Sequence, residues 1–192
     1  MISRAFVALA ALLTLLAAAP RSLKPVDVAI VTSAGTIVVR LETAQAPRTS
    51  ANFLRYVDGQ RYDGAAFYRV VRAVFGQPVP RIQVLQGGLE QTPGAKTFPP
   101  IAVESTTKTG LHNVAGTLAM ARTTDPNSAT AEFFVNLADD RWLDGDRFAD
   151  HQGYAVFARV IRGQNVVAKI GGAPANGESL TPPIRILRMR RI

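Results

Sequence analysis

Hydrophobic and polar residues alternate over several short stretches of this chain, a pattern typical of strands that bury one face. The first two stretches, residues 26–31 and 36–42, flank Ser33-Ala34-Gly35, a spacing that predicts a β-hairpin. Further strands are predicted at residues 66–71, 82–86, 116–122, 131–136, 154–160 and 184–192.

Helical spacing occurs in two places between these strands. Pro47 suits a first helical turn, Phe53 and Tyr56 then share one helical face, and Gly59 suits a left-handed stop. Residues 164–170 predict a second, shorter helix, which two glycines end. Many strands with only two helices predict a mainly β fold, closed as an antiparallel barrel because closure removes exposed edges.

Two adjacent aromatic residues stand out in the strand predicted at residues 131–136. Neighbours on a strand point to opposite faces, so one of Phe133 and Phe134 enters a core while the other lines the surface. The preceding strand brings the small residue Ala121 beside that ring. These two strands therefore predict a pocket for a compact apolar group.

A charged residue interrupts the apolar strand at residues 66–71. Alternation places Arg69 on the same face as Phe67 and Val71, where a guanidinium is costly unless it has partners or a function. The alternative is an arginine at a strand edge that reaches water. Gln86 is a second polar residue in a stretch that otherwise predicts burial.

Composition limits the class of protein. A chain of 192 residues, 47% of them hydrophobic and 19% charged, is long enough for one well-buried domain. The absence of cysteine excludes disulfides, cysteine nucleophiles and thiolate metal sites. The net charge of +8 comes from scattered basic residues, so we expect a solvated basic surface and no nucleic-acid partner.

The N-terminal residues resemble an export signal. Arg4 precedes an apolar run from residue 5 to residue 19 that only Thr14 interrupts, and this run is short for a membrane span. It ends in three alanines, which a signal peptidase accepts. Residues 1–19 are therefore predicted to be a signal peptide, with Pro20 leaving the cut site open by a few residues, and an uncleaved anchor is the alternative.

Other chemistries find little support in the sequence. Residues 144–151 contain alternate acids but lack the terminal glutamate of a calcium loop. His112 and His151 have no partner at ligand spacing. Phosphate-loop, dinucleotide and nucleophile-elbow motifs are absent from the sequence. We expect neither a metal nor a cofactor.

Several segments together resemble the cyclophilin family of peptidyl-prolyl cis-trans isomerases, and their order and number make the resemblance specific. It runs from about residue 26 to residue 192, and residues 119–122 and 128–130 look most like the bacterial exported branch. The segments are Ala51-Asn52-Phe53-Leu54, Tyr62-Asp63-Gly64, Phe67-Tyr68-Arg69-Val70, Gln86-Gly87-Gly88, the strands at residues 116–122 and 131–136, Trp142-Leu143-Asp144-Gly145 and Tyr154-Ala155-Val156-Phe157.

The resemblance implies an eight-stranded antiparallel barrel capped by two helices, with a substrate groove on its outer face. Arg69 matches the catalytic arginine of the family and Gln86 its active-site glutamine. Trp142 matches a residue that helps many members bind the inhibitor cyclosporin. The other matched positions line the proline pocket and groove: Gln83, Val84, Ala121, Arg122, Phe134, Leu143 and Tyr154.

Some positions depart from the family pattern. Gln83 replaces a common pocket phenylalanine, Val84 a common methionine and Tyr154 a common histidine, and residues 72–81 lengthen the step from Arg69 to Gln86. We nevertheless expect an active isomerase, with weakened cyclosporin binding. The alternatives are a non-catalytic protein-binding module on the same barrel and a basic adaptor for anionic envelope polymers.

The resemblance and the export signal together predict where the protein works and on what. We expect a monomeric isomerase in the periplasm or secreted medium, acting on unfolded or partly folded proteins that contain proline. No stable membrane insertion is expected after signal cleavage.

Overall fold

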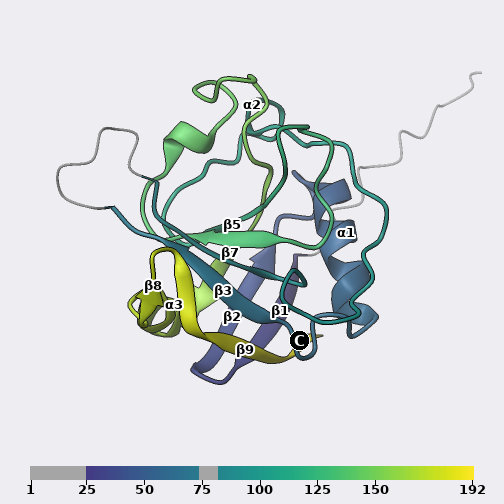
Figure 1. Ribbon diagram of the computed structural model, residues 1–192. Coiled ribbons are helices and arrows are strands. Elements are labelled where there is room, and N and C mark those ends of the chain that lie inside the picture. Colours follow the sequence, from purple (N-terminus) through teal and green to yellow (C-terminus); the bar gives the residue numbers. More distant parts are fainter. Residues whose placement is uncertain (1–24, 74–81) are drawn as a thin grey trace, which may run out of the picture.

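The computed structural model of the protein describes residues 25–73 and 82–192 (Figure 1). Its strands are β1 (Val26–Thr32), β2 (Gly35–Leu41), β3 (Ala66–Val71), β4 (Val84–Gly88), β5 (Thr117–Met120), β6 (Phe133–Asn136), β7 (Val156–Arg162), β8 (Ala175–Asn176) and β9 (Ser179–Arg191). Its helices are α1 (Pro47–Asp58), α2 (Thr106–Thr109), the 3-10 turn η1 (Arg141–Leu143) and α3 (Gln164–Gly171).

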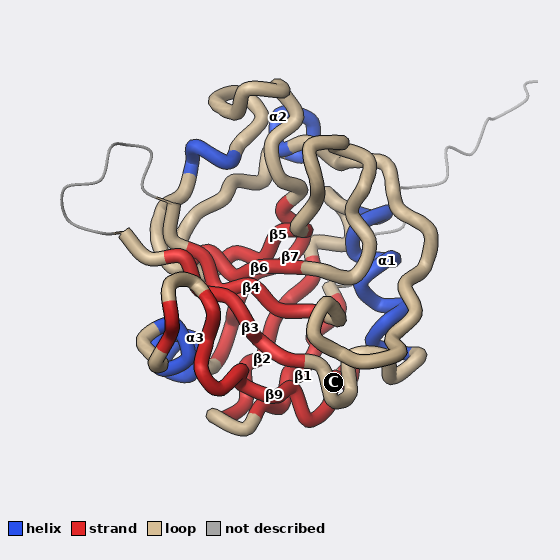
Figure 2. The backbone as a smooth tube through the Cα atoms, viewed as in Figure 1, coloured by secondary structure: helices blue, strands red, loops and turns tan. Residues whose placement is uncertain are grey.

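The strands form a closed antiparallel barrel, seen in red in Figure 2. The order around it is β1-β2-β7-β5-β6-β4-β3-β9, and pairing of β9 with β1 closes the ring. The short strand β8 pairs only with β9, as the first strand of a hairpin outside the ring. The eight-stranded barrel predicted from the sequence is therefore confirmed.

Apolar side chains from all sides of the ring fill the barrel. Five aromatic rings pack together at its centre, with centroids of neighbouring rings 5.1–5.8 Å apart. Phe53 and Tyr56 bring α1 onto this core, and both are fully buried, as the helical pattern predicts. Figure 1 shows α1 and α3, the two predicted helices, on opposite sides of the barrel.

Local details differ from the sequence-based expectation. Gly59 has a φ of −77°, and the left-handed residue after α1 is Gln60, with a φ of 57°. The sequence pattern does not predict helix α2, because four residues are too few to show a helical period. Strand β9 begins at Ser179, five residues before the expected start at Ile184, since Pro182 and Pro183 hide its pattern.

Candidate active site

A row of residues crosses five neighbouring strands on the outer face of the barrel. Arg69 on β3 pairs with Gln86 on β4, and Gln86 pairs with Phe134 on β6. Phe134 pairs with Ala119 on β5, which pairs with Val156 on β7. Antiparallel pairing therefore sets a guanidinium, an amide and an aromatic ring side by side.

A β-bulge in β3 decides which face Arg69 occupies. The pairing of β3 with β4 and with β9 shifts between Phe67 and Arg69, so Tyr68 is an extra residue in the strand. Phe67 is fully buried in the core, whereas the Arg69 side chain is 44% exposed. The prediction that Arg69 shares the face of Phe67 is therefore wrong, because an extra residue reverses the alternation beyond it.

The guanidinium of Arg69 is held from two sides. Its Nη1 donates to Gln86 Oε1 over 2.9 Å, and its Nε donates to Glu178 Oε2 over 2.8 Å. Nη2 lies 2.7 Å from the same carboxylate oxygen. A guanidinium has five N–H donors, so these contacts fix its plane and leave donors for a further acceptor.

A partly buried hydrogen-bond chain in turn orients Gln86. Its Nε2 donates to Tyr68 Oη over 2.7 Å, and that hydroxyl lies 2.8 Å from both Glu90 Oε2 and Glu132 Oε2. Burial raises the pKa of the Glu132 carboxyl above its ordinary value. The amide of Gln86 donates to Tyr68 through its nitrogen. Gln86 is thereby left with its oxygen facing Arg69.

A pocket of about 450 Å³ lies over this row. One side is apolar, with Phe134 as its floor and Leu143 as a wall, and both are almost fully buried. Arg69 also lines the pocket. The described lining consists of Arg69, Val71, Arg72, Ile82, Val84, Gln86, Ala121, Arg122, Phe134, Leu143, Tyr154 and Glu178.

The two aromatic residues of β6 divide as the alternation predicts. Phe133 is fully buried among the core rings, 5.8 Å from Phe67 between centroids. Phe134 belongs to a separate apolar cluster outside the barrel and meets Tyr154 edge-on, with centroids 5.6 Å apart. Phe134 and Ala121, the residues of the predicted apolar pocket, both belong to the described lining, together with polar and charged side chains.

Arg122 forms part of the pocket wall through packing. Its side chain is only 3% exposed, it is ion-paired with Asp150, and its Nε donates to Gly153 O over 3.1 Å. The guanidinium carbon lies 4.6 Å from the centre of the Tyr154 ring. Arg122 thus ties β5 to the loop that presents Tyr154, and its charge is neutralised.

Two of the residues predicted from the resemblance lie outside the described lining of the pocket. Gln83 donates its backbone N–H to Asp140 and accepts a hydrogen bond from Leu137 N, while Ile82 lines the pocket beside it. Trp142 is 48% exposed and stands near Arg147.

The lining also contains residues that the sequence analysis missed. Glu178 comes from the β8–β9 turn, where no sequence pattern links it to β3. Ile82 lies just before β4 and Val71 at the end of β3, close to predicted positions, so a wider apolar window would have found them. Arg72 is the fourth such residue.

The buried carboxyl of Asp140 gives a test of this region through pH. Burial raises its pKa from the ordinary 3.8 to about 6, although the N–H of Gln83 stabilises the charged form. The folded state therefore favours the protonated Asp140 carboxyl. The contribution of this carboxyl to the free energy of unfolding is complete below about pH 3.8 and is lost as pH rises through about 6. We expect Asp140→Asn to be more stable than wild type at pH 8 by about 1–3 kcal/mol.

Urea denaturation at pH 8 and at pH 3.5 measures this difference, which should vanish at the lower pH. Asp146→Asn is the control, because the Asp146 side chain is 53% exposed and its charge does not contribute to the raised pKa of Asp140. An Asp140→Asn protein that is less stable than wild type at both pH values would contradict the assignment.

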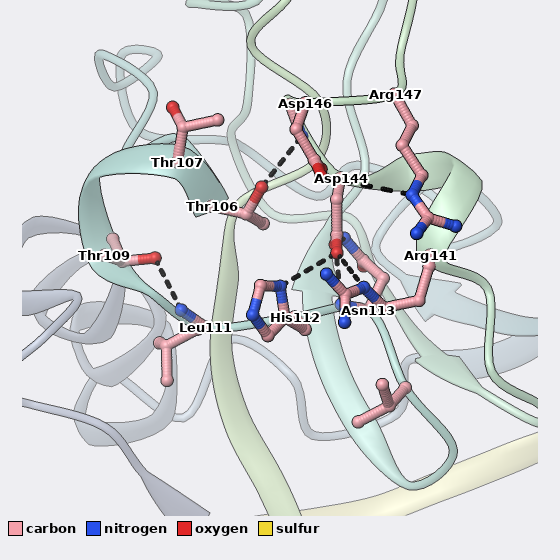
Figure 3. A network of polar contacts seen from close by, with 12 residues as sticks. Thr106, Thr107, Thr109, Leu111, His112, Asn113, Arg141, Asp144, Asp146 and Arg147 are labelled. Atoms are coloured by element: carbon pink, nitrogen blue, oxygen red, sulfur yellow. Dashed lines mark hydrogen bonds and ion pairs between the residues drawn. The ribbon is translucent and has the colours of Figure 1, made fainter.

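A second buried carboxylate, Asp144, anchors the wall formed by Leu143 (Figure 3). It is fully buried, and its Oδ1 accepts from Asn113 N over 2.8 Å and from Asn113 Nδ2 over 2.9 Å. Its Oδ2 lies 2.9 Å from His112 Nδ1 and 2.7 Å from Arg141 Nε. The turn around η1 is therefore fastened to the segment before β5.

Residues 25–73 and 82–192 include no cluster of three or more His, Asp or Glu side chains placed to hold a metal ion. In the same part of the chain, none of the helices has the length and apolar character needed to cross a membrane.

Comparison with solved structures supports the fold. The chain superposes on the crystal structure of a cyclophilin-type peptidyl-prolyl cis-trans isomerase from Cryptosporidium parvum with a TM-score of 0.72. That match covers 88% of this chain and 98% of the other at 19% sequence identity. At this identity the likeness concerns the fold alone.

Comparison of sequences shows the family. Residues 27–191 match the family described as Cyclophilin type peptidyl-prolyl cis-trans isomerase/CLD. A peptidyl-prolyl cis-trans isomerase of Acinetobacter baylyi is 40% identical over 146 residues, 76% of this chain and 71% of its own. Peptidyl-prolyl cis-trans isomerase B of Escherichia coli is 40% identical over 152 residues, covering 77% and 85%. The chain therefore belongs to the cyclophilin-type peptidyl-prolyl cis-trans isomerases, enzymes that act on proline-containing peptides and proteins.

Proposed function

We propose that the pocket over the row from Arg69 to Phe134 is where this isomerase acts. The ring of a substrate proline packs on Phe134 and Leu143, and Arg69 donates a hydrogen bond to the prolyl carbonyl. Gln86 holds the guanidinium in place, while Val84, Ala121, Arg122 and Tyr154 complete the walls. The observation that carries the proposal is the strand register, which sets Arg69 and Phe134 on either side of Gln86.

The chemistry of the reaction fits such a site. Rotation about an X-Pro bond faces a barrier of about 18–20 kcal/mol because the amide is conjugated. No bond to a nucleophile forms, so the site needs to bind the twisted state more tightly than the planar ones. A fixed, always charged fork of donors does this by favouring the deconjugated nitrogen. Lowering the barrier by about 7 kcal/mol corresponds to roughly five decades in rate.

Nuclear magnetic resonance on the labelled protein tests the location. We expect an Ala-Pro peptide to exchange faster between isomers and to shift the signals of Phe134, Leu143 and Arg69. A second hollow of about 370 Å³ lies between α3 and the barrel, beside Ala115 and Val167. Shifts confined to that hollow would refute the proposed site.

We propose further that the enzyme is exported to the periplasm or the medium, where it assists the folding of proline-containing proteins as a monomer. The apolar run at residues 5–19 supports this proposal; it lies outside the described residues. Membership of the bacterial exported branch belongs to the same proposal.

Expression of the full chain in a bacterial host tests export. We expect the protein in the periplasmic fraction, with a new N-terminus within a few residues of Pro20. Replacing Leu12 and Leu13 by arginine should keep the chain in the cytoplasm with Met1 intact. Cytoplasmic wild-type protein that begins at Met1 would contradict the proposal.

A further inference from the structure

The turn between β8 and β9 places Glu178 beside Arg69. Asn176 pairs with Ser179, and Gly177 between them has the left-handed φ of 59° that such a tight turn requires. The carbonyl of Glu178 accepts the backbone N–H of Val70 over 2.8 Å. Backbone pairing therefore fixes Glu178 next to β3.

The carboxylate of Glu178 contacts Arg69 through one of its oxygens and is partly exposed to solvent. Both contacts to Arg69 involve Oε2, and the Glu178 side chain remains 53% exposed. Among the described residues that line the pocket, Glu178 is the only acid. The other charged residues of this lining are Arg69, Arg72 and Arg122, and Arg72 donates to the carbonyls of Gly171 and Ala173.

We propose that Glu178 is a specificity-determining residue that selects lysine or arginine directly after the substrate proline and disfavours aspartate or glutamate there. The inference rests on the proposed function, in which Arg69 binds the prolyl carbonyl. The carbon of that carbonyl is bonded to the nitrogen of the next residue, whose Cα lies about 3.8 Å from that of proline. The side chain of this residue therefore leaves the pocket beside the carboxylate that shares Arg69.

The size of the preference that Glu178 gives for a basic residue after proline depends on how exposed the carboxylate is. Exposed ion pairs are weak. The ratio of kcat/KM for a lysine peptide to that for a glutamate peptide nevertheless combines two effects of Glu178, its attraction for the lysine and its repulsion of the glutamate. Replacing Glu178 by glutamine leaves only cations among the described charged residues of the lining. We expect Glu178→Gln to lower the ratio of kcat/KM for the lysine peptide to that for the glutamate peptide by about three- to tenfold.

The experiment measures isomer exchange in Ala-Ala-Pro-Xaa-Ala peptides, with lysine, glutamine or glutamate as Xaa. Glu42→Gln is the matched control, because Glu42 also pairs with an arginine, Arg159, but does not line the pocket. We expect it to keep the wild-type ratio. In Glu178→Gln the change should shrink at 0.5 M salt, since salt screens exposed charges.

Two outcomes would overturn the inference: an unchanged ratio in Glu178→Gln, or an equal change in Glu42→Gln. Assays of the uncharged glutamine peptide with wild type and Arg69→Ala distinguish failure of the Glu178 inference from failure of the proposed function. Equal rates in those two proteins refute the role of Arg69, whereas faster wild-type exchange with an unchanged charge ratio refutes only the role of Glu178.

Discussion

Replacement of Arg69 by alanine is expected to lower kcat/KM for a proline peptide by about 10²–10³-fold. The proposed site stabilises the twisted amide through one fixed donor group, and removal of such a donor typically costs this much. Arg69→Lys should recover little of the loss, because an ammonium keeps the charge but lacks the planar fork held by Gln86 and Glu178. Exchange spectroscopy on a short peptide measures the rates.

Arg159→Ala is the control for this experiment. Arg159 is also an arginine on a barrel strand with a carboxylate partner, yet it does not line the pocket. Its replacement should leave kcat/KM within twofold of wild type, and thermal unfolding should show that both variants are folded. An Arg69→Ala enzyme with more than half of the wild-type kcat/KM would remove Arg69 from the mechanism.

Replacement of Asp144 by alanine is expected to lower the free energy of unfolding by about 3–5 kcal/mol. The carboxylate is fully buried, and its loss leaves Asn113, His112 and Arg141 without their common partner. Each buried donor left unpaired adds a desolvation cost. Urea denaturation followed by circular dichroism measures the change.

The neighbouring Asp146 provides the control for this second prediction. Its side chain is 53% exposed, and its contact with Arg147 is 3.9 Å long, so Asp146→Ala should change stability by no more than about 0.5 kcal/mol. Because Leu143 precedes Asp144, the Asp144→Ala enzyme should also lose activity at temperatures where wild type is active. A loss of stability below about 1 kcal/mol would show that the network contributes little.

Local patterns were sufficient for most strands and for both main helices. Alternation on β6 separated Phe133 from Phe134, because the side-chain period of a strand depends on neighbours in the chain only. The same rule failed on β3, where the bulge at Tyr68 turns Arg69 outward. A bulge is a property of two paired strands, so one strand read alone does not reveal it.

The matched motifs led to most of the pocket, with Gln83 as an informative exception. Alignment places Gln83 at a pocket position, yet its backbone is held by Asp140 and Leu137 while Ile82 lines the pocket. Asp140 and Leu137 come from the segment after β6, and the sequence around Gln83 alone does not reveal these contacts.

The sequence by itself determined the class of fold, the family and the residue types available for catalysis. The alternation along a strand depends only on neighbouring residues, and the segments that resemble cyclophilins follow one another along the chain in the order of that family. Only the tertiary structure decided which partners hold those residues. Glu178 meets Arg69 across 109 positions of the chain, and Gln86 is oriented by Tyr68, Glu90 and Glu132. Such contacts follow from strand order and barrel closure, which bring distant turns together and leave no local trace in the sequence.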